Sequence, residues 1–309
     1  MRQQRKHLKN KELFLIDWIC RQAAQRVPRA QKSQIRLGIG DDAAILASPP
    51  NGRELLITTD LVVEGAHFQP ATHPARALGH KVLTRGLSDI AAMGGAPLYC
   101  LLSLCLPSWA GREWLKQFYQ GLFDLARGSR VALVGGDLAA GRLFTADIVV
   151  IGSAPRGRAV RRSGAHPGDI LYVSGPLGGS ALGLERLGQG RSAKDPAVRR
   201  HLYPQPRLDL RLPAATAAMD ISDGLSLDLY RLTQASRVGA EVRAAGIPLW
   251  PGASLHQALH GGEDYELLFT LPPGRRPPPG STAIGAITAR RRLTLDNRPL
   301  PIQGFQHDL

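Results

Sequence analysis

A chain of 309 residues with 43% hydrophobic and 21% charged side chains is long enough for about two globular domains. This composition excludes a fully disordered chain, a collagen-like fibre and a small disulfide-stapled fold. No apolar run reaches the roughly 20 residues that span a bilayer, and the run 13–20 lacks a signal-peptide cleavage site. We therefore expect a cytoplasmic protein with no membrane partner.

The net charge of +14 at pH 7 raises the alternative of a basic nucleic-acid-binding or scaffold protein. The basic residues are scattered, however, and aromatic residues make up only 6% of the chain. No helix-turn-helix, RNA-binding or zinc-finger pattern is recognisable, and a positive field suits a phosphorylated small molecule equally well. We therefore expect no nucleic-acid partner and interpret residues 1–12 as a flexible basic lead-in.

The hydrophobic pattern of the first half predicts alternating helices and strands. Helices are expected at residues 11–26, 74–93 and 111–127. Strands are expected at residues 55–59, 98–106, 131–134 and 144–151, and a loop rich in Gly and Asp enters a strand over 35–46. The Pro near the start of the second helix and the Gly pair after its end are typical helix boundaries.

Around residues 154–168 the chain becomes basic and contains Gly and Pro, which we interpret as the boundary between domains 1–154 and 155–309. The second half repeats the alternation. Strands are expected at 170–173, 241–243 and 266–271, helices at 180–187 and 225–235, and a Pro-rich surface loop at 272–280. The pattern predicts an α/β (α+β) protein with two domains.

Aspartates recur beside Gly, Ser or Thr at the predicted ends of strands and helices. One such residue alone is more simply explained as a turn or a helix cap. Five in one basic chain favour a shared site, because Mg²⁺ prefers carboxylate, hydroxyl and carbonyl oxygens and could hold a polyphosphate there. The segments are GDD 40–42, TTD 58–60, LSD 87–89, GGD 135–137 and DISDG 220–224, and GGED 261–264 adds another carboxylate pair.

Other nucleotide and hydrolase motifs do not fit the chain. Residues 38–43 match GxGxxA, but two carboxylates there would repel a pyrophosphate unless a cation intervened. There is no Walker A lysine, zinc pattern or GxSxG elbow, so any bound ATP needs metal ions and arginines to neutralise its phosphates. His67 lies seven residues after Asp60 and could reach the same site or simply be packed.

Together these segments resemble the thiamine-monophosphate kinase family. The matching pieces are GIGDDAAIL 38–46, TTDLVVEGAHF 58–68, LSDIAAMGGAP 87–97, GGD 135–137, GRAVRRSGAHPGD 157–169, DISDGLSLDL 220–229 and GGEDYELLFT 261–270. The resemblance runs from about residue 13 almost to the C-terminus. Its wider superfamily, with aminoimidazole ribonucleotide synthetase and selenophosphate synthetase, shares the fold more loosely.

The resemblance implies an aminoimidazole ribonucleotide synthetase-like fold and a homodimer formed by the N-terminal domain, which binds ATP and Mg²⁺. It implies ATP-dependent phosphorylation of thiamine monophosphate to thiamine diphosphate, the last step of thiamine diphosphate biosynthesis. The matched metal positions are Asp42, Thr58, Thr59, Asp60, Asp89, Asp137, Asp220 and Asp223. The matched ATP positions are Tyr119, Gly136, Asp137, Arg162 and Ser222, and the matched substrate positions are His67, Glu263 and Phe305.

Phosphoryl transfer between two anions depends mainly on positioning and charge neutralisation. We therefore expect the catalytic roles to fall on Asp60, Asp89, Asp220 and Arg162. The alternative within enzymes is another ATP-using superfamily member with a different phosphorylated acceptor. The chain departs from the family at Gly179, where Asp is frequent, and at Phe305, where Trp is frequent.

Overall fold

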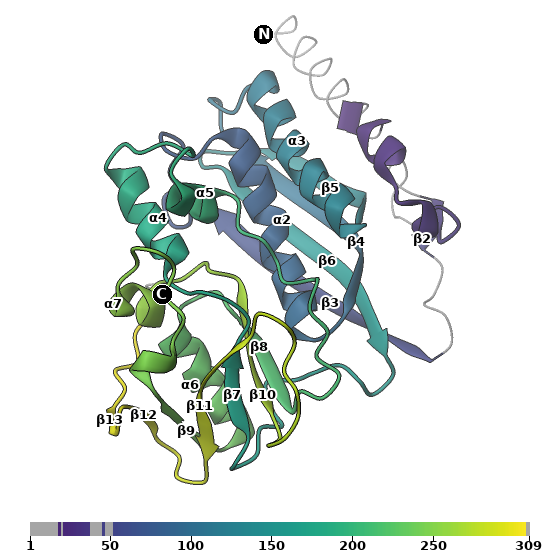
Figure 1. Ribbon diagram of the computed structural model, residues 1–309. Helices are drawn as coiled ribbons and strands as arrows, with labels where there is room; N and C mark the ends of the chain where they lie inside the picture. Colours follow the sequence, from purple (N-terminus) through teal and green to yellow (C-terminus); the bar gives the residue numbers. More distant parts are fainter. Residues whose placement is uncertain (1–17, 20, 38–44, 47–51, 307–309) are drawn as a thin grey trace, which may run out of the picture. The chain divides into compact units, whose positions relative to one another are not determined.

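The computed structural model describes residues 18–19, 21–37, 45–46 and 52–306, and these form two compact units (Figure 1). The first unit holds the described residues before Gly52 together with Ile57–Gly86 and Pro97–Ser153. The second holds Gly52–Leu56, Leu87–Ala96 and the residues from Ala154 onward. Both units combine a sheet with helices, so the predicted α/β class is confirmed.

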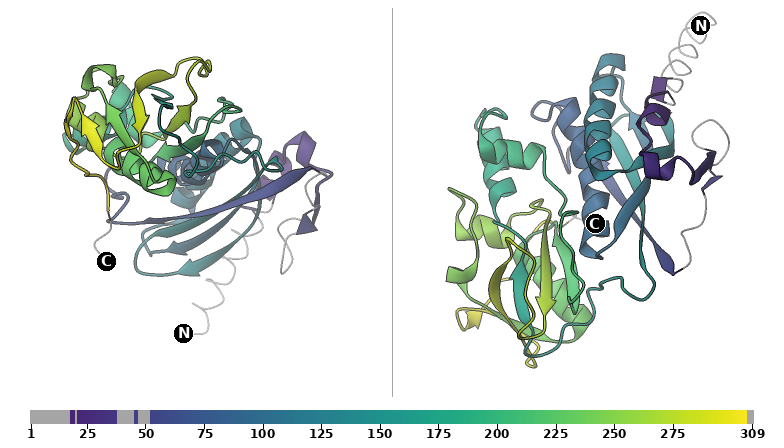
Figure 2. Two further views of the ribbon diagram at one scale, coloured as in Figure 1. Left: turned by 90° about the horizontal axis from the view of Figure 1, so that it is seen from below. Right: turned by 45° about the vertical axis from the view of Figure 1, so that its right-hand side comes forward.

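The first unit is built on a four-stranded sheet in the order β3-β6-β4-β5, and helices α2 and α3 lie on one face of it (Figures 1 and 2). Strands β4 and β5 pair in parallel. The elements are β3 Arg53–Val63, α2 Ala75–Ala92, β4 Ala96–Leu106, α3 Arg112–Ser129, β5 Ala132–Ala140 and β6 Thr145–Pro155. They are preceded by helical residues 18–19 and 21–26, η1 Arg29–Gln31, β1 Ile35–Leu37 and β2 Ile45–Leu46.

Two glycines allow helices α2 and α3 to touch through their backbones. A Cβ atom added at Gly79 of α2 would lie 1.8 Å from the carbonyl oxygen of Phe118 in α3. A Cβ at Gly121 of α3 would lie 1.8 Å from the carbonyl oxygen of Arg76 in α2. Any side chain at either position would therefore push the two helices apart.

The second unit is built on a seven-stranded sheet in the order β13-β12-β9-β11-β7-β10-β8. All its recorded pairings are antiparallel except that of β12 with β9. The strands are β7 Ile170–Val173, β8 Ala217–Ile221, β9 Gly239–Val242, β10 Glu266–Leu271, β11 Thr282–Thr288, β12 Leu293–Leu295 and β13 Arg298–Pro299. The helices are α4 Gly179–Gly188, α5 Pro196–Leu202, α6 Leu225–Ser236, η2 Ala244–Gly246 and α7 Leu255–His260.

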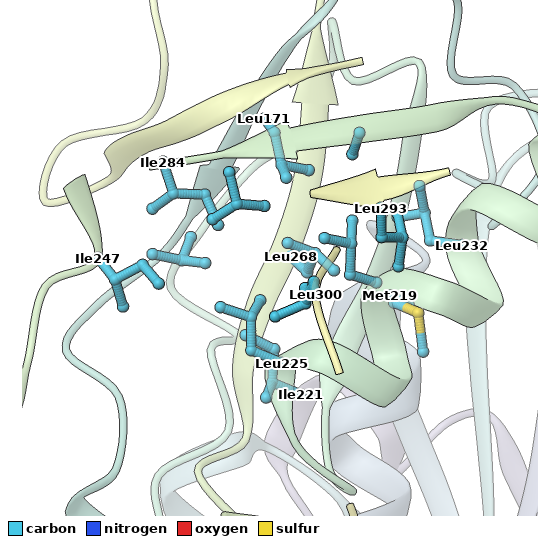
Figure 3. Close-up of a cluster of buried hydrophobic side chains, with 14 of the residues drawn as sticks. Leu171, Met219, Ile221, Leu225, Leu232, Ile247, Leu268, Ile284, Leu293 and Leu300 are labelled. Carbon is cyan, nitrogen blue, oxygen red and sulfur yellow. The ribbon is translucent and has the colours of Figure 1, made fainter. Parts of the chain in front are cut away.

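Apolar side chains cover both faces of this second sheet. On one face, Leu225 and Leu232 of α6 pack with Met219, Leu268 and Ile284 of the strands (Figure 3). On the other face, the cluster consists of Ala91, Ala92, Val160, Leu210, Leu212, Ala218, Leu267, Phe269 and Leu271. Because β10 is buried on both faces, its apolar residues Leu267, Leu268 and Phe269 are consecutive rather than alternating.

The predicted helices at 74–93, 111–127, 180–187 and 225–235 and the strands at 98–106, 144–151, 170–173 and 266–271 are confirmed within a few residues. Two expectations were wrong about strand ends. Asp60 lies inside β3 and Asp137 lies inside β5, so these aspartates do not follow their strands, whereas Asp89 lies inside α2 as the predicted helix 74–93 places it. Strand β8 was missed, because Ala-Ala-Met has little β-propensity and only burial makes it a strand.

None of the helices in the described part of the chain is both long and apolar enough to cross a membrane.

We predict that Gly121→Ala lowers the free energy of unfolding by about 2 kcal/mol or more, because its methyl group meets the backbone of α2. Gly128→Ala is the matched control in the same helix, since an added Cβ there meets nothing within 4 Å. That control should gain about 0.5 kcal/mol from helix propensity. Urea unfolding of both variants measures the difference, and equal stability of the two would contradict the close helix contact.

Candidate functional site

The turn after β8 gathers four of the predicted site residues within the second unit. The carbonyl oxygen of Ser222 accepts a hydrogen bond from the Glu263 amide at 2.7 Å, and that of Asp223 accepts one from the Phe305 amide at 3.0 Å. Segments far apart in the sequence therefore meet on one turn. Glu263 and Phe305, predicted as substrate residues, are thus attached to Ser222 and Asp223, predicted as ATP and metal residues.

Asp220 lies one residue before the end of β8 and points to the face opposite Met219 and Ile221. Its buried carboxylate accepts a hydrogen bond from Ser88 Oγ at 2.8 Å. Ser88 immediately precedes Asp89 on α2, in the part of that helix that belongs to the second unit. Ser88 thus links the two predicted metal ligands, because it adjoins Asp89 in the chain and donates a hydrogen bond to Asp220.

The sequence analysis missed Asp228, which lies in the first turn of α6 and is completely buried. Its Oδ2 atom accepts hydrogen bonds from three successive backbone amides of the turn, and Arg231 donates to its Oδ1 at 3.0 Å. Burial, together with the charge of Asp223, raises the pKa of Asp228 to about 6. The matched segment DISDGLSLDL contains this residue, and an acidic residue in a first helical turn could have been recognised as a cap.

Residues 263 and 265 adopt a backbone conformation that is rare outside glycine, with φ of 65° at Glu263 and 50° at Tyr265. Between them, Asp264 is fully buried and accepts hydrogen bonds from the amides of Gly178 at 2.6 Å and Ser180 at 3.0 Å, at the start of α4. Burial raises the pKa of Asp264 to about 6. The cap anchors this segment and thereby fixes where Glu263 lies.

The side chain of Glu263 faces a buried histidine. Its Oε2 atom lies 3.6 Å from Nδ1 of His201, and Ser180 Oγ lies 2.9 Å from the same nitrogen. Three residues after Glu263, the buried carboxylate of Glu266 accepts hydrogen bonds from Arg200 at 2.8 Å and Arg207 at 2.6 Å. The pairing of both carboxylate oxygens with guanidinium groups compensates the burial of that charge.

The departure at Gly179 has a steric explanation in this chain. A Cβ atom added at Gly179 would lie 2.8 Å from Cδ2 of Trp250 and 2.9 Å from its Cγ. Trp250 is itself held in place, because its amide donates to the carbonyl of Leu177 at 2.9 Å. The rigid indole therefore occupies the space that an aspartate at position 179 would need.

In the first unit, the alternation of β3 sends neighbouring predicted residues to opposite faces of the sheet. Asp60 points toward α2, where Arg85 donates to its Oδ1 from Nε at 3.2 Å and from Nη2 at 3.1 Å. Thr59 points the other way and donates to Oδ1 of Asp147 at 2.6 Å. The structure therefore does not bring the side chains of Thr59 and Asp60 together, whereas Thr58 shares the face of Asp60.

Gly136 and Asp137 lie on β5, at the opposite edge of the sheet from β3. A Cβ at Gly136, whose φ is 152°, would lie 1.9 Å from the carbonyl oxygen of Leu102, so only glycine fits beside β4. Asp137 is exposed, and its Oδ1 accepts the amide of Leu138 at 2.8 Å. With two strands between, β3 and β5 lie roughly 14 Å apart at about 4.8 Å per pairing, so this sheet alone does not join Asp60 to Asp137.

The remaining predicted residues lie in different environments. His67, in the turn after β3, accepts the amide of Val63 at its Nδ1 at 3.1 Å. Tyr119 is buried among the rings of Trp18, Phe118 and Phe123. Arg162 is exposed, and its carbonyl oxygen accepts Ser236 Oγ at 2.8 Å. Asp42 lies outside the described residues.

Within the described residues, no three His, Cys, Asp or Glu side chains are grouped closely enough to hold a metal ion. The donor chemistry nevertheless suits Mg²⁺, because the predicted ligands are carboxylates and hydroxyls without nitrogen or sulfur. Two of these carboxylates, Asp60 and Asp223, are ion-paired with Arg85 and Arg231. A hard divalent cation bound at either carboxylate would therefore share it with the guanidinium or displace it.

Comparisons with known proteins agree with this architecture. Family models of the AIR synthase related proteins match, the N-terminal domain model over residues 40–154 and the C-terminal domain model over 166–277. The thiamine-monophosphate kinase of Escherichia coli K12 is 42% identical over 260 residues, which cover 79% of each chain.

Two solved structures are similar along most of their length. The thiamine-monophosphate kinase of Stenotrophomonas maltophilia K279a has a TM-score of 0.81 and 36% identity, covering 90% of this chain and 95% of its own. AaThiL complexed with AMPPCP and TMP has a TM-score of 0.79 and 33% identity, covering 84% of this chain and 89% of its own. The predicted aminoimidazole ribonucleotide synthetase-like fold is confirmed, and the chain belongs to the thiamine-monophosphate kinase family.

Proposed function

We propose that this protein transfers the γ-phosphoryl group of ATP to thiamine monophosphate, which gives thiamine diphosphate and ADP. Its relatives are thiamine-monophosphate kinases, and one of similar fold forms a complex with AMPPCP and TMP. The observation that carries the proposal for this chain is the turn after β8. Backbone hydrogen bonds there connect proposed nucleotide and metal residues to Glu263 and Phe305, the proposed acceptor residues.

The attacking oxygen belongs to a phosphate that is already ionised near neutral pH, so the reaction needs no strong general base. Its main obstacle is repulsion between two anions. Arg162 is exposed and able to fork onto a phosphate group. The half-exposed ring of Phe305 offers a face on which an aromatic ring of the acceptor can stack. Within the second unit, Glu263 is a proposed acceptor residue and Ser222 a proposed ATP residue; within the first unit, His67 is a proposed acceptor residue, and Tyr119 and Gly136 are proposed ATP residues.

When bound, Mg²⁺ ions would neutralise the phosphate charges that otherwise oppose the reaction. The residues that would hold them are Asp42, Thr58, Thr59, Asp60, Asp89, Asp137, Asp220 and Asp223. For Thr59 the geometry favours the main-chain carbonyl over the hydroxyl, because its hydroxyl donates to Asp147 on the other face of the sheet.

We further propose that the N-terminal domain, residues 1–154, forms a homodimer through the sheet face that α2 and α3 leave open, while residues 155–309 form the C-terminal domain. Leu55, Ile57 and Leu61 of β3 alternate along this open face and are 49%, 67% and 51% exposed. A row of large apolar side chains in water is unfavourable, and burial against a second copy removes it. The same face therefore supplies a self-complementary surface.

We predict that Asp60→Asn reduces turnover at least about 100-fold, because it removes a charged metal and phosphate-site ligand. The assay contains the purified full chain, ATP, Mg²⁺ and thiamine monophosphate, and it follows thiamine diphosphate, with free thiamine as the control acceptor. Asp124→Asn is the matched control, since Asp124 also pairs with an arginine, Arg76, on the surface of the same unit.

Normal turnover by folded Asp60→Asn would contradict the role of Asp60. Equal losses in the Asp60 and Asp124 variants would attribute the effect to a lost ion pair rather than to catalysis. A folded wild-type protein that makes no thiamine diphosphate would overturn the proposed function and favour another phosphorylated acceptor.

For the dimer, we predict that Ile57→Lys combined with Leu61→Lys yields a monomer. The dimer would bury the ammonium groups of both lysines against the same groups of the second copy, and burial of such unpaired charges is unfavourable. Leu184→Lys is the control, since Leu184 is 52% exposed on α4 in the second unit. Sedimentation velocity measures the mass in solution of the wild type, the double variant and the control. A wild-type monomer, or an unchanged dimer in the double variant, would exclude this face as the interface.

A further inference from the structure

We propose that Asp228 is a positioning residue whose carboxylate serves as an internal anion for the turn 222–224. By occupying the backbone amides of that turn, it leaves the Ser222 hydroxyl and the Asp223 carboxylate as the groups the turn presents to ligands. This inference deepens the proposed function, on which its kinetic part rests.

Three backbone amides converge on one carboxylate oxygen. The amides of Ser222, Asp223 and Gly224 lie 3.1, 3.0 and 3.1 Å from Oδ2 of Asp228. Successive amides that point into one concavity form a typical anion-binding nest, of the kind that often receives a phosphate. Here the nest lies at the start of a 12-residue helix, yet a side chain of that same helix occupies it.

The internal anion is shielded from solvent and from competing ligands. Asp228 is completely buried, so a phosphate could reach these amides only by displacing a charged side chain from the protein interior. The turn therefore interacts with phosphates through cations or arginines rather than through its own amides. This gives a physical reason why a phosphate-transfer site would carry so many carboxylates in a strongly basic chain.

A guanidinium group connects the internal anion to the proposed metal ligand. Nη1 of Arg231 donates both to Oδ1 of Asp228 at 3.0 Å and to Oδ2 of Asp223. Two adjacent carboxylates thus share one counter-charge, and Arg231 fixes where the Asp223 side chain lies. Displacement of Asp228 would release Arg231 and Asp223 together.

The turn has little freedom to compensate for such a loss. A Cβ at Gly262 would lie 2.7 Å from the carbonyl oxygen of Ser222, and one at Gly304 would lie 2.6 Å from that of Asp223. The Glu263 and Phe305 segments are therefore in tight backbone contact with the turn. A shift of the turn moves the proposed acceptor residues as well as the proposed metal ligand.

Two substitutions separate geometry from charge. Asp228→Asn keeps an oxygen at the distance required by the three amides but removes the charge and replaces Oδ1, the acceptor of Arg231, with a donor. Asp228→Glu keeps the charge but places the oxygens one methylene farther from the backbone. Gln234→Ala, at an exposed position of the same helix, is the control that touches neither group.

The first readout is backbone hydrogen–deuterium exchange of residues 222–224 in the full chain, which requires no activity. We expect exchange to rise about tenfold or more in Asp228→Glu and to stay within about threefold of wild type in Asp228→Asn and Gln234→Ala. Unchanged exchange in Asp228→Glu would overturn the proposal.

The second readout is thiamine diphosphate formation as a function of Mg²⁺ concentration. We expect Asp228→Glu to lose turnover about 100-fold and to need about tenfold more Mg²⁺ for half-saturation, whereas Asp228→Asn retains turnover within about tenfold. General destabilisation would reduce the folded fraction without moving the Mg²⁺ midpoint, so an unmoved midpoint also overturns the proposal. If wild type forms no product, the proposed function fails while the exchange measurement still decides the role of Asp228.

Discussion

The organisation of the second unit depends on how the backbone groups of one turn, Ser222 to Gly224, are satisfied. Its amides donate to Asp228, and the carbonyl oxygens of Ser222 and Asp223 accept hydrogen bonds from the amides of Glu263 and Phe305. Buried backbone groups must find such partners, because an unpaired one costs as much as a lost hydrogen bond. Here that requirement assembles the site, since each partner belongs to a different segment of the chain.

Opposite charges are arranged locally, although the chain as a whole is basic. Asp60 faces Arg85 in the first unit, and in the second unit Asp223 faces Arg231 while Glu266 faces two arginines. The excess of arginine therefore partly serves to hold carboxylates in fixed positions. The ion pairs of Glu266 with its two arginines are buried and stabilise the surrounding backbone. The ion pairs of Asp60 and Asp223 are more exposed, so cations can reach these two carboxylates.

Close backbone approach explains several glycines that sequence motifs alone would assign to ligand binding. Gly136 belongs to the GGD segment, but its backbone meets β4 where no side chain fits. Gly179 faces the indole of Trp250, which leaves no room for a side chain at that position. A glycine in a functional motif can thus be required by the scaffold as much as by a ligand.

The sequence by itself determined the α/β class, most of the long helices and strands, the family and the set of candidate residues. Apolar periodicity and short polar motifs are local, so they can be read along the chain without a structure. The sequence pattern did not predict β8, whose strand conformation comes from burial between its neighbours. It also placed the ends of β3 and β5 too early, since Asp60 and Asp137 lie inside these strands.

Only the tertiary structure decided which candidate side chains share a location. Pleating separates Thr59 from Asp60, and strand order separates Asp60 from Asp137, although each pair looked equivalent in the sequence. Glu263 and Phe305 reach the turn after β8 because their amides donate to the carbonyl oxygens of Ser222 and Asp223. Such proximity arises from packing and backbone pairing between distant segments, which residue spacing along the chain does not encode.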